Sequence, residues 1–317
     1  MTAATLAMRD VWAETLIELG SVNPDLLVLD GDLGTSTRAD RFAAAHPHQF
    51  LQMGIAEQNM IGVAAGLSTL GYVPWLSSFA VFFTHRSIDQ IRVVVAQPHA
   101  NVKIGAAYSG LLTGKTGKTH QDVEDLAIMR AMPGMTVLAP GDASECAAMV
   151  RWATDTPGPV YLRLARDAGP DLFDGGYRFE PSRVIPLRDG SDVLIVSTGV
   201  QSARCVEAAV LLEARGISAA VLHVPSVKPV DEEAIATAAR GVPLVVSVEE
   251  HTILGGLGGL VAEILGERAP RRVVRIGIRD AWGESASNAF LLDRHGLSAE
   301  RVAERVADEL ARVPSST

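Results

Sequence analysis

The chain has 317 residues, 48% of them hydrophobic and 21% charged, and its formal net charge is -9 at pH 7. This composition predicts a folded protein with room for two domains, each with its own core. The negative net charge argues against a nucleic-acid-binding surface, which would need clustered Lys and Arg.

Before the first strand, the N-terminal stretch predicts an amphipathic helix from about Ala4 to Leu19, with acids in it, rather than a signal peptide. No apolar run approaches the length of a membrane span, so we expect a cytoplasmic protein without a membrane partner. Cys146 and Cys205 lie in different halves of the chain. Neither a disulfide framework nor a thiolate metal site is therefore expected.

Short apolar segments alternate with helical ones through the first half of the chain, which predicts βα units and a mostly parallel sheet. The strands are expected at residues 26–29, 49–53, 73–78, 102–107, 136–139 and 160–163. The first strand runs into Asp30-Gly31, as is usual at the edge of a parallel sheet where ligands bind.

The stretch after Arg166 is rich in Gly and Pro and shows no sustained period, which is typical of a linker. Further strands are expected at 191–199, 219–224, 243–249 and 273–278, followed by a long helix over 298–312. The sequence thus predicts two doubly wound α/β domains, residues 1–175 and 191–317, joined by a linker at 176–190.

Glu57 is the leading candidate for chemistry. It precedes a helix of small and apolar residues, in which Gly62 and Gly66 permit close backbone approach. A carboxyl among such neighbours would be poorly solvated, which disfavours its ionised form and leaves its proton available to a ring nitrogen. The alternative is an acid that only stabilises the helix N-terminus.

Three aromatic rings, Phe79, Phe82 and His85, follow the expected strand at spacings of three. This spacing would place them along one helical face. Such a face can stack on a flat heterocycle, although Phe at helical spacing is more often part of a core.

Several motifs together resemble the pyrimidine-binding half of the transketolase family, whose members use thiamine diphosphate. They are G-I-A-E-Q at 54–58, G-Y-x-P at 71–74, S-S-F-A-x-F at 77–82, D-Q-I-R at 89–92 and G-K-T-H-Q-x-V-E-D-L-A at 117–127. The resemblance runs in order from Arg9 to about Leu297, and its last part is similar to the family's C-terminal domain.

The resemblance implies roles around the cofactor's aminopyrimidine ring. Glu57 would hydrogen-bond its N1′ atom, the aromatics at 79, 82 and 85 would hold the ring, and Asp32 would lie near it. Without the resemblance, Asp32 would be interpreted as a turn residue that satisfies its own backbone.

The glycine-rich segment 114–121 lacks the spacing of a nucleotide phosphate loop, because only two residues separate Gly114 from Gly117. The resemblance implies instead that it lines the substrate channel and that His120 exchanges protons with substrate oxygens. Thr116 and Tyr108 stand where ordinary transketolases have an acid and a His. We therefore expect substrates other than the usual pentose phosphates.

Arg9, Ser36 and Arg166 match family residues that grip the acceptor's phosphate, and guanidinium groups suit bidentate phosphate recognition. Seen alone, Arg9 and Arg166 would be interpreted as surface charges. Tyr108 in place of His is expected to alter one of these phosphate contacts.

The chain has no G-D-G segment, through which the family binds the diphosphate and its metal. The resemblance therefore implies the C-terminal subunit of a split transketolase. A partner chain would supply the diphosphate-binding domain, hold Mg²⁺ or Ca²⁺ and share the thiamine diphosphate, as an α2β2 assembly. The implied reaction moves a two-carbon ketol unit from a ketose or its phosphate to an aldose or other aldehyde.

Alternatives remain open at this point. The β subunit of a 2-oxoacid dehydrogenase shares the two-domain organisation, and a 1-deoxyxylulose-5-phosphate synthase-like enzyme belongs to the same family. The motifs G-K-T-H-Q and A-E-Q fit transketolase better than the dehydrogenase. A non-catalytic assembly subunit is a further alternative, against which the intact Glu57 speaks.

Overall fold

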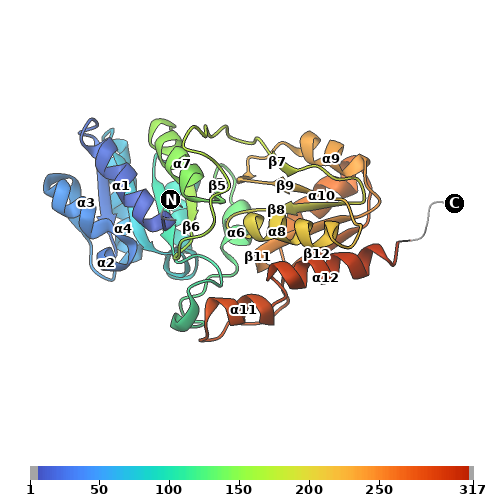
Figure 1. Ribbon diagram of the computed structural model, residues 1–317. Coiled ribbons are helices and arrows are strands. Elements are labelled where there is room, and N and C mark those ends of the chain that lie inside the picture. The colour runs from blue at the N-terminus through green and yellow to red at the C-terminus, as the bar shows by residue number, and fades with distance from the viewer. Residues whose placement is uncertain (1–5, 314–317) are drawn as a thin grey trace.

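The computed structural model describes residues 6–313, which form two α/β domains around two separate sheets (Figure 1). The first sheet has seven strands in the order β10-β5-β6-β4-β3-β1-β2. Its strands are β1 (Leu26–Asp30), β2 (Phe50–Gln52), β3 (Val73–Phe79), β4 (Lys103–Ala107), β5 (Thr136–Leu138), β6 (Val160–Leu164) and β10 (Ser226–Lys228). The pairs among β1 to β6 are all parallel.

Helices cover both faces of this sheet. One face carries α1 (Met8–Gly20), α2 (Gly34–Thr37), α3 (Ala39–Ala45) and α7 (Ala143–Asp155), and the other carries α4 (Glu57–Thr69), α5 (Ile88–Gln90) and α6 (Asp125–Arg130). Because both faces are covered, β1, β4 and β6 are buried along their whole length. Of the predicted first helix, residues 4 and 5 lie outside the described range, and α1 begins at Met8.

Short irregular helices complete the first domain. They are two 3-10 helices, Pro47–Gln49 and Gly114–Thr116, and two π-helices, Phe82–Arg86 and Ile91–Ala96. The first π-helix directly follows Ala80 and Val81 at the end of β3, so its position at the edge of the sheet matters for the candidate site below.

The second sheet has five strands in the order β12-β11-β8-β9-β7. These are β7 (Ile185–Arg188), β8 (Val193–Ser197), β9 (Ala219–His223), β11 (Val245–Thr252) and β12 (Val273–Ile278). Helices α8 (Gln201–Glu213) and α12 (Ala299–Leu310) cover one face, and α9 (Glu232–Arg240) and α10 (Leu257–Arg268) cover the other. Helix α11 (Asn288–Arg294) lies beside the first-domain loop that carries the 3-10 helix Gly114–Thr116, at the bottom of Figure 1.

The two-domain α/β architecture with mostly parallel sheets confirms the predicted fold class. Two short strands differ from the expectation. The stretch 176–190, predicted as a linker, contains β7, which pairs antiparallel with β9 at the sheet edge. Strand β10 leaves the second domain to pair antiparallel with β5 of the first.

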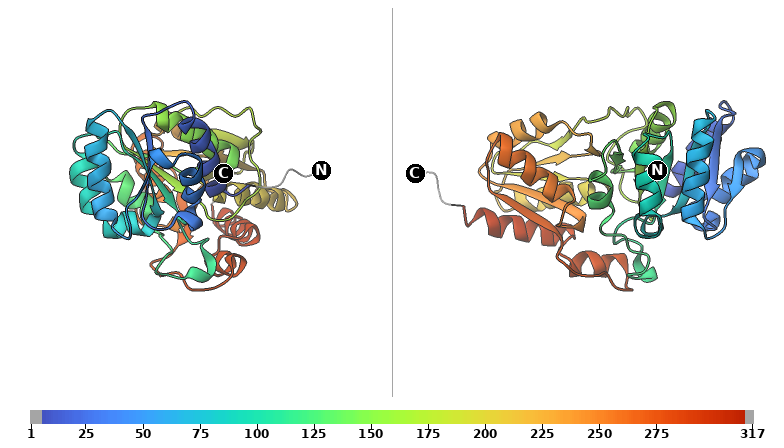
Figure 2. Two further views of the ribbon diagram at one scale, coloured as in Figure 1. Left: turned by 90° about the vertical axis from the view of Figure 1, so that its left-hand side faces the viewer. Right: turned by 180° about the vertical axis from the view of Figure 1, so that it is seen from behind.

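The two domains lie side by side, as the rear view in Figure 2 shows, and share a continuous apolar core. A buried set of polar side chains, which we call the polar seam, also joins them. Its members are Asp125, Glu145, Arg163, Ser202, His223 and Glu250, all at most 6% exposed. Arg163 donates from Nε to Asp125 Oδ2 at 2.9 Å and from Nη2 to the Glu250 carbonyl at 2.9 Å.

The remaining side chains of the polar seam are also hydrogen-bonded to one another. His223 Nε2 lies 2.8 Å from Glu145 Oε2, and its Nδ1 lies 2.6 Å from Ser202 Oγ. Cys146 and Cys205 are both buried and free. Within residues 6–313, no helix has the length and apolar character needed to cross a bilayer.

Candidate active site

Glu57 is the first residue of α4, at the edge of the sheet where the parallel strands end. Its side chain is buried, with 1% of the residue exposed, as the sequence predicted. Ser78, near the end of β3, donates a hydrogen bond from Oγ to Glu57 Oε1 at 3.1 Å. Gly31 completes the surroundings, because a Cβ there would lie 3.2 Å from Ser78 Oγ and 3.5 Å from Glu57 Oε1.

The surroundings of Glu57 are less apolar than expected. Arg86 donates from Nη1 to Glu57 Oε2 at 2.7 Å, and its guanidinium carbon lies 4.1 Å from the centre of the Phe82 ring. An opposite charge this close offsets part of the cost of burying a carboxylate. The expectation of a carboxyl with apolar neighbours alone is therefore wrong.

Stacked aromatic rings cover this edge of the sheet. The Phe79 ring stacks on Phe82 with centroids 5.8 Å apart and on Tyr108 with centroids 4.1 Å apart. The ring of His120 meets both Phe79 and Phe82 edge-on at 5.7 Å. The structure thus brings Phe79, Phe82, Tyr108 and His120 together as a flat-sided aromatic group.

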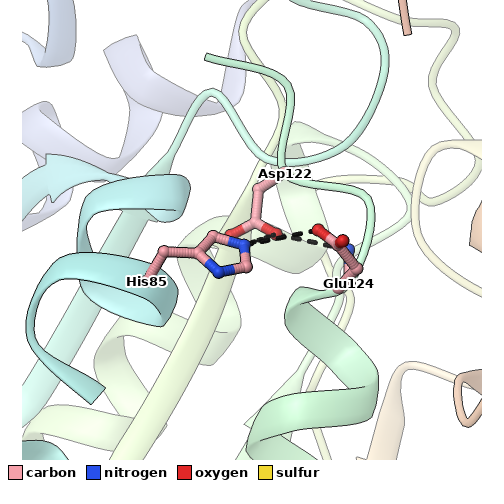
Figure 3. A group of neighbouring side chains, drawn as sticks. All are labelled: His85, Asp122 and Glu124. Carbon is pink, nitrogen blue, oxygen red and sulfur yellow. Dashed lines mark hydrogen bonds and ion pairs between the residues drawn. The ribbon is translucent and has the colours of Figure 1, made fainter. Parts of the chain in front are cut away.

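His85 belongs to a different cluster (Figure 3). Its Nε2 atom lies 3.3 Å from Glu124 Oε2 and 3.9 Å from Asp122 Oδ1. The predicted single helical face is wrong, because Phe79 ends a strand and Phe82 and His85 lie on a π-helix. In that helix hydrogen bonds span five residues, so a spacing of three no longer aligns side chains.

His85, Asp122 and Glu124 each offer one nitrogen or oxygen atom that could bind a metal ion, and these three atoms lie within 4.8 Å of one another. Among residues 6–313, no other group of His, Cys, Asp and Glu side chains has this arrangement. Burial, followed by the charge of Asp125, raises the pKa of Asp122 to about 6, and Thr84 donates a hydrogen bond to it. These side chains are the ones in the described chain that are placed to hold a divalent cation.

The Thr116 side chain makes no hydrogen bond to the aromatic group within the described residues. Its hydroxyl donates to the Thr113 carbonyl at 3.1 Å and lies 2.7 Å from Thr113 Oγ1, within its own loop. The loop is anchored on the second domain, where Ser285 donates to the Lys115 carbonyl at 2.6 Å. Lys115 and Lys118 on this loop are exposed.

Two arginines flank Tyr108. Arg9 Nη1 donates to the Tyr108 hydroxyl and to the Ser36 carbonyl, both at 2.9 Å. Arg9 and Arg166 place their guanidinium carbons 5.7 Å and 5.3 Å from the centre of the Tyr108 ring. The Nε atoms of both arginines are buried without a hydrogen-bond partner, so each retains an unused donor.

Asp32 is exposed, has a φ of 66°, and makes no hydrogen bond or ion pair within the described residues. The turn is satisfied instead by Asp30, whose Oδ2 accepts from the backbone nitrogens of Leu33 and Gly34, each at 3.0 Å. Burial raises the pKa of the Asp30 carboxyl, which these hydrogen bonds partly oppose. Asp32 is thus left free at the strand edge.

Sequence reasoning missed Arg86, Ser78 and Asp30. Arg86 directly follows His85, and Ser78 directly precedes Phe79, so both are sequence neighbours of predicted site residues. The signal for Asp30 was its place as the last residue of an apolar strand before Gly31. The hydrogen bonds of Arg86 and Ser78 to Glu57 cannot be inferred from sequence spacing, because each joins separate elements.

Two family models match the chain. The transketolase pyrimidine-binding domain matches residues 4–171, and the transketolase C-terminal domain matches residues 182–302. The chain belongs to the transketolase family.

Similar proteins include the 6-deoxy-6-sulfo-D-fructose transketolase subunit of Clostridium sp. (strain MSTE9), which is 37% identical, with 96% of this chain and 94% of that protein covered. An apulose-4-phosphate transketolase subunit of Phocaeicola vulgatus is 35% identical, with 94% of this chain and 95% of that protein covered. A solved structure described as a split gene transketolase, inactive β4 tetramer, is 45% identical with a TM-score of 0.90, covering 98% of this chain and 100% of that one.

The residues present fit the pyrimidine half of the cofactor of this transketolase family. A buried carboxylate lies beside a group of parallel aromatic faces, which suits a flat, hydrogen-bonding heterocycle. The edge remains open, because Ile55 is 72% exposed and the His85 side chain is 45% exposed. Neither feature provides ligands for a diphosphate group.

Proposed function

We propose that this chain is the C-terminal subunit of a split transketolase. It transfers a two-carbon ketol unit from a ketose or ketose phosphate to an aldose or other aldehyde, together with a partner chain. The partner supplies the diphosphate-binding domain and holds Mg²⁺ or Ca²⁺, in an α2β2 assembly. The absence of a G-D-G segment from the sequence supports this division of labour.

The observation that carries the proposal is the position of Glu57. It is a carboxylate that is 1% exposed, at the ends of parallel strands and beside stacked Phe rings, with its charge balanced by Arg86. Buried charged groups at the carboxyl edge of a parallel sheet are good candidates for ligand contact.

The cofactor supplies the nucleophilic carbon that takes up the two-carbon fragment. Glu57 would hold a proton at the N1′ atom of its pyrimidine ring, and Phe79 and Phe82 would orient that ring. His120, whose ring edge meets both Phe rings, would pass a proton to or from a substrate oxygen. Asp32, free at the strand edge, would lie within the same site.

Arg9, Ser36 and Arg166 would bind the charged end of a substrate. The two unused Nε donors beside Tyr108 support this role, because guanidinium groups form charge-assisted bonds with phosphate and sulfonate oxygens. One similar protein is named for 6-deoxy-6-sulfo-D-fructose, which carries a sulfonate, and another for apulose 4-phosphate. We therefore infer a donor or acceptor with an anionic end, outside the usual pentose phosphates.

Calorimetry with thiamine diphosphate and Mg²⁺ tests the division between the two chains. The purified chain alone is expected to show no binding in the micromolar range, since it lacks the G-D-G segment through which the family binds the diphosphate and its metal. Adding a chain with the diphosphate-binding domain should give tight, Mg²⁺-dependent binding and ketol transfer. Tight Mg²⁺-dependent binding by this chain alone would overturn the proposal.

The inactive β4 tetramer formed by the similar structure supports the same conclusion. We expect this chain without its partner to form a homo-oligomer without ketol transfer activity. Sedimentation analysis before and after addition of the partner measures the change in assembly.

The dehydrogenase alternative predicts a different reaction. A decarboxylation assay with 2-oxoacids on the reconstituted pair separates the two, because ketol transfer from a ketose to an aldehyde releases no CO2.

A further inference from the structure

A cleft in the C-terminal domain lies outside the candidate active site. It has a volume of about 300 Å³ and lies beside β12, the edge strand of the five-stranded sheet. Three elements form its walls: β12 with the residues that follow it, the C-terminal end of α11, and the first half of α12. Figure 1 shows α12 running beneath β12 next to α11.

The lining of this cleft is strongly basic. Five of its nine lining residues are arginines, a sixth is His295, and none is acidic. The arginines are Arg275 and Arg279 on the strand side and Arg294, Arg301 and Arg305 on the helix side. In a chain with a net charge of -9, such a concentration of positive charge is not explained by average composition.

The carboxylates that pair with these arginines lie outside the lining. Arg294 pairs with Glu284 at 3.4 Å, Arg301 with Asp293 at 2.8 Å and Arg305 with Glu309 at 2.7 Å. Arg301 also pairs with Glu304 at 3.3 Å. All three arginine side chains are at least 45% exposed. Exposed pairs of this kind are weak and readily exchange one anion for another.

Glu309 cannot neutralise Arg305 alone, because it also pairs with Arg272 and Arg312. One carboxylate therefore serves three guanidinium groups at the end of α12. The balance of charge around the cleft remains positive even after its ion pairs are counted.

Two donors of the cleft have no protein partner. Arg279 makes no hydrogen bond or ion pair with any other residue in the range 6–313, and its side chain is exposed. The Nε2 atom of His295 is buried without a hydrogen-bond partner. Burial, followed by the charge of Arg294, lowers the pKa of His295, as expected beside concentrated positive charge.

We propose that this cleft binds a small phosphorylated molecule with two anionic groups, of the kind found in sugar bisphosphates and pyrophosphate. One anionic group would meet Arg279 from the strand wall, and the other would meet the arginines of the helix wall. Arg275 lines the cleft as well, but its Nη1 atom already donates to the Ile253 carbonyl at 2.8 Å. The volume lies at the lower end of the range for small-molecule sites. Guanidinium groups favour phosphate oxygens through paired, charge-assisted hydrogen bonds.

Calorimetry on the full purified chain tests the proposal, with fructose 1,6-bisphosphate and inorganic pyrophosphate as separate probes at fixed ionic strength. We expect one saturable site per chain with a Kd of about 1 mM or tighter for at least one probe. Arg279→Glu and Arg294→Gln should each weaken it by about tenfold. Arg240→Glu, on the exposed face of α9 in the same domain, is the matched control and should leave the Kd unchanged.

The candidate active site also contains arginines, so Arg166→Ala serves to locate the bound anion. Binding that persists in Arg166→Ala and is weakened in Arg279→Glu supports the proposal, and the probe with the lower Kd distinguishes an organic from an inorganic source. Three outcomes would overturn it: no saturable binding of either probe, binding unchanged by Arg279→Glu, or binding lost in Arg166→Ala. The first two do not bear on the ketol transfer reaction, because the cleft lies outside its site, and the third would assign the anion to the candidate active site instead.

Discussion

The aromatic edge of the first sheet and the polar seam between the domains both contain arginine and acidic side chains. They differ in whether these side chains have partners within the chain. In the seam, the guanidinium group of Arg163 is 6% exposed and meets a carboxylate and a carbonyl of its own chain. At the edge, Arg9 and Arg166 keep Nε donors without partners, and Asp32 is exposed and unpaired within the described residues. The polar groups of the seam are hydrogen-bonded within the chain, whereas those at the edge retain donors and a carboxylate without partners among the described residues.

This difference separates structural from functional polar groups. Ser202, His223 and Glu145 are linked as a nucleophile, base and acid would be, yet all three are fully buried, so no substrate can reach them. Buried polar groups that are fully hydrogen-bonded hold elements together. Glu57 is equally buried but lies under an exposed edge, where a ligand can replace solvent.

The largest expected effect comes from Glu57→Gln. In the reconstituted enzyme it should lower kcat by about 10²- to 10⁴-fold, since loss of a general acid-base partner commonly has this cost. The isosteric amide keeps the hydrogen bond from Ser78, so folding and assembly should persist. Steady-state kinetics measures the rate, and circular dichroism with size-exclusion chromatography verifies the fold.

Glu232→Gln is the matched control for this variant. Glu232, like Glu57, is the first residue of its helix, but it lies on α9 in the other domain. It should keep nearly the full rate. If Glu57→Gln also retains more than about a third of the wild-type rate, Glu57 only stabilises a helix terminus.

A substitution in the polar seam should lower the free energy of unfolding, whereas Glu57→Gln should lower the rate. Arg163→Met leaves Asp125 buried and deprived of its ion pair, which commonly costs about 3–5 kcal/mol. Arg151→Met removes an exposed partner of Glu18 and should cost at most about 1 kcal/mol. Urea unfolding of both variants measures the difference. Equal stabilities would mean that the seam does not depend on its buried charges.

The two regions also differed in how far the sequence predicted them. Strand β1 was located to within a residue, because its continuous apolar run reflects burial on both faces. Strand β10 was missed, since its three residues gain their pairing only from β5 in the other domain. β7 was missed because Pro186 argues against a strand and is tolerated only at a sheet edge.

At the candidate site, local motifs identified Glu57, Phe79 and His120, whereas the ion pair to Arg86 depends on tertiary packing. The placement of His85 failed for a specific reason. The sequence rule assumes 3.6 residues per turn, and the π-helix Phe82–Arg86 has a wider turn.

Lys103 is another buried ionisable residue, at the opposite end of β4 from the aromatic edge. It should make the stability of the protein depend on pH. It is 0% exposed, and its Nζ lies 2.6 Å from the carbonyl oxygens of Thr156 and Gly158. Burial lowers its pKa to about 7, and a neutral amine still has two N–H donors for these carbonyls. The unfolded chain therefore binds more protons than the folded chain between about pH 7 and 10.

The free energy of unfolding should accordingly rise by about 2 kcal/mol between pH 7 and pH 9 through Lys103 alone. Lys103→Met should lack this increment, whereas Lys115→Met, at an exposed lysine, should retain it. Urea unfolding at several pH values gives the difference between each variant and the wild type. A wild-type slope equal to that of Lys103→Met would show that the buried amine stays charged.

The smallest expected effect concerns substrate choice at the loop that carries Thr116. An acid at this position adds a negative charge between the exposed Lys115 and Lys118, which lowers the local positive potential. Thr116→Asp should therefore shift the ratio of kcat/KM values by about three- to tenfold, away from ketoses with an acidic group near this loop and toward xylulose 5-phosphate, which has only neutral hydroxyl groups besides its phosphate. Thr116→Asn matches the shape without the charge and should keep the wild-type ratio. The ratio is measured on the reconstituted pair with ribose 5-phosphate as acceptor. If Asp and Asn give the same ratio, charge at this loop does not select the substrate, and the hydrogen bonds of Thr116 to Thr113 are its whole role.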